Sequence, residues 1–88
     1  MPTYLVESYG PNNGDAPADA RERAARAAEL GAGVRYVRTT FLPGDETVLH
    51  VFEAASAEDL RRAAVLAALQ HERIVEAVEA RDGREETT

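Results

Sequence analysis

The chain has 88 residues, enough for one small domain, and no cysteine, which excludes disulfides and thiolate metal sites. Its 16 acidic and 10 basic residues give a formal net charge of -6, which argues against nucleic-acid binding. No apolar run is long enough to span a membrane, and the N-terminal residues show no signal-peptide pattern. We therefore expect a cytoplasmic protein, and a core this small favours self-association as a source of stability.

Hydrophobic periodicity and turn residues divide the sequence into six elements. In chain order they are a strand at 3–9, a helix at 18–30, a strand at 34–41, a strand at 47–53, a helix at 57–69 and a strand at 73–79. Gly31 and Gly33 end the first helix, and Ser56 to Asp59 resemble a capping box that starts the second. The five residues 42–46 form the turn of a hairpin between the second and third strands.

The order βαββαβ predicts an α+β domain with a ferredoxin-like fold. Right-handed crossovers give a four-stranded antiparallel sheet of strand order 4-1-3-2, with both helices on one face. Residues 1–81 form this single domain, and residues 82–88 form a frayed polar tail. The face without helices is called the open face below.

Two assumed registers assign side chains to the faces: Phe41 pairs with Thr47, and Leu5 pairs with Phe52. The helix-covered face then carries Tyr4, Val6, Val37, Phe41, Leu49 and Val51. The open face carries Leu5, Glu7, Tyr9, Tyr36, Arg38, Val48, His50 and Phe52. So many large apolar groups on one uncovered face predict that another subunit covers it.

Glu7 and His50 form a row with Arg38 across this predicted open face, and three interpretations remain open. The row is a satisfied polar cluster at a subunit interface. Alternatively, Glu7 and His50 are ligands of nickel, zinc or copper, completed by a symmetry mate or by ligand oxygens. In the third interpretation, His50 or Glu7 is a base, and Arg38 or Tyr36 polarises a small organic substrate.

The same face offers Tyr9, Tyr36 and Arg38 as candidate ligand contacts. The other histidine, His71, follows the second helix and is expected to be a solvated loop residue. The sequence contains no P-loop, no GxGxxG and no HExxH, so no organic cofactor is indicated.

Four short segments carry a family resemblance: Tyr4-Leu5-Val6-Glu7, Phe52-Glu53-Ala54, Ser56-Ala57-Glu58 and Arg73-Ile74-Val75-Glu76. They resemble a family of short bacterial ferredoxin-like proteins of unknown function, some described as nickel-binding, over about residues 3–79. Members often have a cysteine near the place of His50. The resemblance implies a dimer or higher oligomer and binding of a divalent transition metal.

The sequence thus predicts a small homo-oligomeric protein that binds nickel, zinc or another divalent transition metal on the open face through Glu7 and His50. The alternative is a cofactor-independent enzyme, monooxygenase- or cyclase-like and of the dimeric α+β barrel type, acting on a small aromatic or polyketide-like substrate. A second alternative is a structural domain without a ligand. Phe52→Glu is expected to dissociate the oligomer.

Overall fold

Four strands and two helices form in the order βαββαβ that the sequence predicts. The computed structural model describes residues 1–9 and 16–78, so the predicted tail at 82–88 lies outside the described residues. The elements are β1 (Thr3–Tyr9), α1 (Ala16–Leu30), β2 (Val34–Leu42), β3 (Thr47–Ala54), α2 (Ala57–Leu66) and β4 (Arg73–Ala77). A single 3-10 turn, η1 (Pro43–Asp45), joins β2 to β3.

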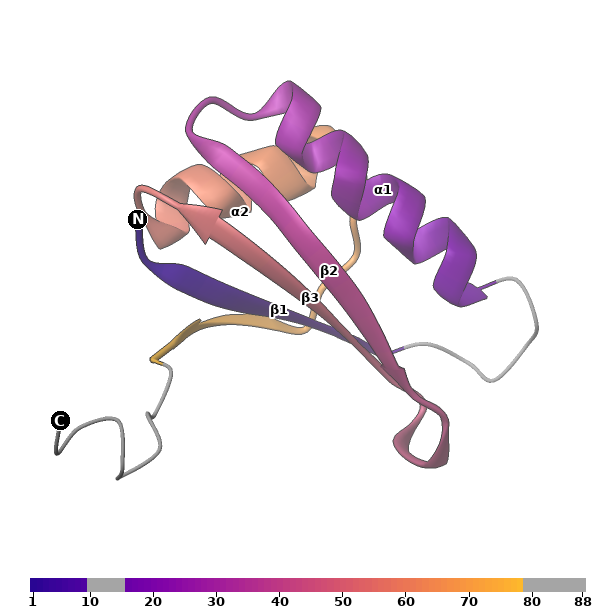
Figure 1. Cartoon of the computed structure of the whole chain (residues 1–88). Helices are drawn as coiled ribbons and strands as arrows, with labels where there is room; N and C mark the ends of the chain where they lie inside the picture. Colours follow the sequence, from indigo (N-terminus) through magenta and orange to yellow (C-terminus); the bar gives the residue numbers. More distant parts are fainter. Residues whose placement is uncertain (10–15, 79–88) are drawn as a thin grey trace, which may run out of the picture.

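The strands form one antiparallel sheet of order β2-β3-β1-β4, which is the predicted order read from the opposite edge. Figure 1 shows α1 and α2 together on one face of this sheet. No described helix covers the other face, the open face of the prediction. This arrangement is consistent with a ferredoxin-like fold.

Small residues let the two helices lie close to each other and to the sheet. Ala24 and Ala27 of α1 and Ala63 of α2 are buried. A Cβ added to Gly31 would lie only 2.4 Å from the Cβ of Ala63, so the end of α1 approaches α2 without room for a side chain. The largest fully buried side chains of the domain are Phe52, Leu60, His50, Val6 and Val48.

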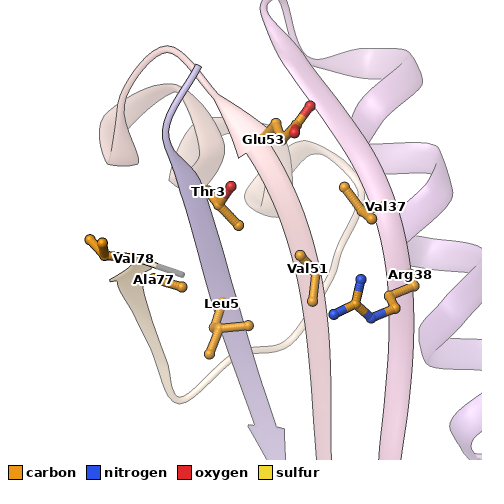
Figure 2. A pocket seen from close by; sticks show the side chains of 8 residues that line it. All are labelled: Thr3, Leu5, Val37, Arg38, Val51, Glu53, Ala77 and Val78. Atoms are coloured by element: carbon orange, nitrogen blue, oxygen red, sulfur yellow. The ribbon is translucent and has the colours of Figure 1, made fainter. Parts of the chain in front are cut away.

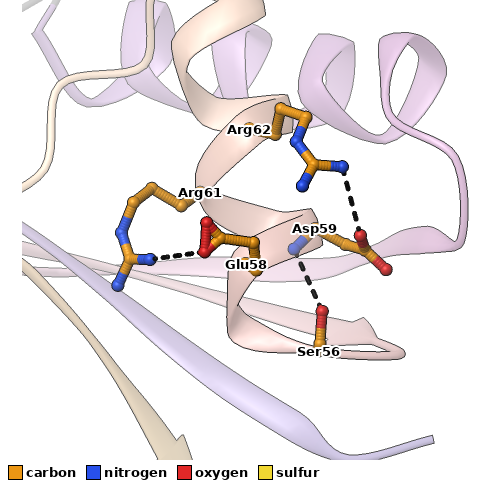
Figure 3. A network of polar contacts seen from close by, with 5 residues as sticks. All are labelled: Ser56, Glu58, Asp59, Arg61 and Arg62. Carbon is orange, nitrogen blue, oxygen red and sulfur yellow. Dashed lines mark hydrogen bonds and ion pairs between the residues drawn. The ribbon is translucent and has the colours of Figure 1, made fainter.

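The start of α2 confirms the predicted cap. Ser56 Oγ accepts a hydrogen bond of 3.1 Å from the amide of Asp59, as Figure 3 shows. Two ion pairs, Glu58–Arg61 and Asp59–Arg62, lie on the same turn at 3.5 Å each. Because these pairs are largely exposed, they add little to stability, and the cap and the buried face of α2 hold the helix.

The end of α2 differs from the prediction, because the helix stops at Leu66 rather than at residue 69. Ala68 adopts a left-handed conformation with φ 55°, and its amide bonds the carbonyl of Val65. A residue in this conformation cannot continue a right-handed helix, so the chain turns here toward β4.

The predicted hairpin register is wrong by one residue. Thr47 pairs with Leu42, not with Phe41. The strand β2 extends one residue further than expected, so four residues rather than five separate the two strands. The shift holds from Leu42 to Arg38, and an irregularity between Arg38 and Tyr36 restores the predicted register, so that Tyr36 pairs with Phe52.

The register between β1 and β3 is also wrong by one residue. Leu5 pairs with Val51 rather than with Phe52, and Val6 pairs with His50. Since strand side chains alternate, this slip moves every β3 side chain to the face opposite to the predicted one. The physical reason is the core: Val48 and Phe52 are buried beneath the helices, and each such side chain is worth about 1.5–3 kcal/mol when buried. The side chains that change from the helix-covered face to the open face are Val37, Leu49 and Val51.

Candidate functional site

The open face contains a cavity of about 320 Å³. It is lined by Thr3, Leu5, Val37, Arg38, Val51, Glu53, Ala77 and Val78, drawn from all four strands and the residue after β4 (Figure 2). Val51 is only 8% exposed although no described helix covers this face, so it lies deep between its neighbours. The volume is at the lower end of the range of about 300–1,000 Å³ that is usual for small-molecule sites.

Among the described residues, the cavity has mostly apolar walls and one cation without an ion pair, Arg38. Figure 2 shows the side chain of Arg38 extending from β2 toward β3, on the side of Val51. Arg38 makes no ion pair with any residue in the described part of the chain. The carboxylate of Glu53 is bound by Arg35 at 2.8 Å. Arg38 is therefore the charge on the cavity wall that remains free for a ligand.

A β-bulge places two adjacent β2 residues at this cavity. The pairing with β3 shifts between Tyr36 and Arg38, and Val37 is the extra residue. In a regular strand, neighbouring side chains point to opposite faces, so Val37 and Arg38 could not both line one cavity. Bulges redirect side chains in this way at sheet edges and near functional sites. The strand pattern of the sequence did not indicate this bulge.

Behind the bulge, three polar side chains form a hydrogen-bonded chain that runs into the core. The hydroxyl of Tyr36 lies 2.5 Å from Oγ1 of Thr39, which lies 2.8 Å from Nδ1 of His50. His50 is 0% exposed, and its Nε2 has no hydrogen-bond partner among the described residues. Burial lowers the pKa of His50 to about 4, so the imidazole is neutral at pH 7 and can accept a hydrogen bond.

Ion pairs lie on both sides of the apolar centre of the open face. Glu7 on β1 binds Arg73 at the start of β4 at 2.8 Å. Arg35 near the start of β2 binds Glu53 near the end of β3 at the same distance. Leu5 and Val51 lie between the two pairs, and Glu53 also lines the cavity, so acidic and basic groups flank the apolar centre at two separate places.

The two predicted metal ligands are not brought together. Glu7 lies on the open face, whereas His50 is buried on the helix-covered face, paired across from Val6. The prediction that they form one unit is wrong, and the register slip explains why. Within residues 1–9 and 16–78, no cluster of three or more His, Asp or Glu side chains could hold a metal ion.

The three predicted ligand contacts have different outcomes. Arg38 lies on the open face at the cavity, where it was expected. Tyr36 was placed on the same face, but it packs against Phe52 in the core, with ring centroids 5.6 Å apart. Tyr9 lies on the open face, 69% exposed, and is not among the described residues that line the cavity.

Two further features were expected from the sequence: a solvated His71 and the absence of a membrane-spanning segment. Nδ1 of the half-buried His71 lies 3.1 Å from the carbonyl oxygen of Leu69, so a local contact occupies one ring nitrogen. In the part of the chain that the structure describes, neither helix is both long and apolar enough to cross a membrane.

Comparison with known proteins identifies the fold and leaves the function open. No protein-family model and no curated protein matches the sequence. The crystal structure of SCO4226 from Streptomyces coelicolor A3(2) is similar with a TM-score of 0.72 and 16% sequence identity. The match covers 90% of this chain and 99% of that one. At this identity the likeness shows that the two chains share a fold along nearly their whole length.

Proposed function

We propose that the protein is a small homo-oligomeric binding protein whose open faces come together and enclose a small molecule. The observation that supports this proposal is the open-face cavity, with its apolar walls and the unpaired Arg38. A mostly apolar cavity with a few convergent polar groups is the usual form of a small-molecule site. With one side open to solvent, it needs a second wall to bury a ligand.

A second copy of the chain is a suitable second wall of the cavity for two reasons. The open face exposes apolar side chains, including Val37 on the edge strand β2 and Val75 on the edge strand β4, which are 39% and 37% exposed. The flanking ion pairs offer both signs of charge on the same surface. In a two-fold interface each patch meets itself, so a face that carries both signs is able to complement its own copy. Burial of this face would also add to a core that is small for a stable domain.

Metal binding and catalysis have less support from the geometry. Nickel or zinc would need ligands from more than one chain, because Glu7 and His50 lie on opposite faces. Among the described side chains that line the cavity, Glu53 is the one carboxylate, and Arg35 occupies it. A ligand-binding role is therefore the form of the proposal that the side chains support best.

The test is the state of association of two matched variants. Val75→Glu places a carboxylate on the open face, and Val65→Glu places the same carboxylate on the outward face of α2, where Val65 is 69% exposed. Sedimentation velocity at low micromolar concentration should show an oligomer for the native protein and for Val65→Glu, and a monomer of 9.5 kDa for Val75→Glu. A monomeric native protein, or a Val75→Glu variant that associates like the native protein, would refute the proposal.

The variant expected earlier to dissociate the oligomer, Phe52→Glu, is unsuitable for this purpose. Phe52 is fully buried in the core against Tyr36, on the face that the helices cover. An unpaired carboxylate there would destabilise the fold itself.

A further inference from the structure

We infer that the ligand of the open-face cavity is a small carboxylate bound by Arg38, and that the buried His50 positions Arg38 through Thr39. This inference rests on the proposed function and adds to it the class of ligand and a positioning residue. Three features support it: the charge of Arg38, the hydrogen bonds that hold the bulge, and a buried histidine whose Nε2 has no partner among the described residues.

The first feature is the guanidinium of Arg38. It points from β2 toward β3 and lies near Val51, on the face that the proposed interface covers (Figure 2). A cation removed from water without a partner costs several kcal/mol, and the described residues supply no partner. A carboxylate matches the planar fork of a guanidinium with two parallel hydrogen bonds. Because Glu53 lies on the same wall, the cavity favours a single negative charge over a doubly charged phosphate.

The second feature is the backbone that carries Arg38. The hydrogen bond between the hydroxyls of Tyr36 and Thr39 closes over the two bulge residues, Val37 and Arg38. Thr39 is in turn held by Nδ1 of His50, which is fixed in the core. Both ends of the bulge are therefore anchored on the helix-covered side, and the direction of Arg38 on the open side depends on these anchors.

The third feature is the histidine at this core position. His50 lies beside Phe52, with ring centroids 6.5 Å apart, in a position that an apolar side chain could fill. Its Nε2 is buried without a partner among the described residues, which is unfavourable for stability. Residues that break a local packing rule are expected at functional sites. The bond to Thr39 is the interaction that a leucine in this place would lose, which points to positioning of the bulge.

The experiment compares two probes of the same shape, benzoate and benzamide, which differ in charge. Isothermal titration should show that the native oligomer binds benzoate roughly tenfold or more tightly than benzamide, as expected for a charge-assisted hydrogen bond. Arg38→Gln should remove this preference. Equal binding of both probes would overturn the inference and leave the proposed function standing. If neither probe binds and the native protein is still an oligomer, the inference is also overturned, because Arg38 then serves the interface alone.

The positioning role has its own variants. Thr39→Val removes both hydroxyl contacts with little change of shape, and His50→Leu removes the anchor. Both should weaken benzoate binding several-fold and leave benzamide binding unchanged, a difference that a general loss of packing would not produce. His50→Asn, whose side-chain oxygen can take the place of Nδ1, should restore part of the preference for benzoate. If Thr39→Val discriminates between the probes as the native protein does, the positioning role is refuted, whether or not His50→Leu folds.

Discussion

Acid should destabilise this protein through His50 in a defined pH range. Burial lowers the pKa of this side chain from 6.5 to about 4, whereas in the unfolded chain the group titrates near 6.5. Between these values the unfolded state binds more protons than the folded state, so the free energy of unfolding falls as the pH falls. At 1.36 kcal/mol per pKa unit, about 2 kcal/mol is lost between neutral pH and about pH 5. The loss approaches about 3 kcal/mol below about pH 4, where both states are protonated.

Urea unfolding followed by circular dichroism across this range measures the effect. The asparagine of His50→Asn cannot titrate. Between neutral pH and about pH 5, the free energy of unfolding of this variant should therefore fall by about 2 kcal/mol less than that of the native protein. His71→Asn removes the other histidine and serves as the matched control variant. If the native protein and His50→Asn lose the same free energy between neutral pH and about pH 5, the imidazole is not buried as described and the reasoning fails.

Four further substitutions test the local structure by urea unfolding. Ser56→Ala should lower the free energy of unfolding by about 0.5–2 kcal/mol, because it removes the cap of α2, and no loss would mean that packing alone sets the start of the helix. Ala68→Gly should raise it by up to about 1 kcal/mol, since Ala68 has φ 55° and is exposed, whereas Ala25→Gly on the exposed side of α1 should lower it by a similar amount. Ala68→Gly and Ala25→Gly should change the free energy of unfolding in opposite directions. A change in the same direction for both would contradict the left-handed conformation of Ala68. Gly31→Ala should cost about 1–3 kcal/mol, because its Cβ would meet Ala63 at 2.4 Å, and native stability would show that the helices separate freely.

The elements of this fold could be predicted because their signals are local. Most strands are short segments that turn residues bound on both sides. Ser56 precedes the apolar stripe of α2 at the spacing that a cap requires. The order of six elements then leaves few topologies, and the handedness of crossovers selects the observed strand order. None of these steps depends on how one strand is aligned with the next.

The alignment of the strands could not be predicted, because β3 is apolar on both sides. Leu49 and Val51 on one face and Val48 and Phe52 on the other are equally suited to burial, so alternation does not distinguish the faces. The assumed pairing of Leu5 with Phe52 then placed the polar His50 on the open face beside Glu7. A neutral imidazole with a hydroxyl partner is tolerated inside the core, so the polar residue carried less weight than its apolar neighbours.

The alternation of side chains along the edge strand β2 predicts the face of Arg38 correctly and the face of Tyr36 wrongly. Arg38 was placed on the correct face, because Phe41, three residues later, packs toward the helices and fixes the direction of that part of β2. The same count places Tyr36 beside Arg38, and the bulge at Val37 breaks the count between them. Nothing in the residues Tyr36 to Thr39 marks a bulge, since no glycine or proline interrupts them. The hydroxyl of Thr39 stabilises the irregular backbone from inside the core, and this contact exists only when β3 has its true register. The cavity and the chain of hydrogen bonds behind it are therefore one consequence of the register, which is why a one-residue error concealed both.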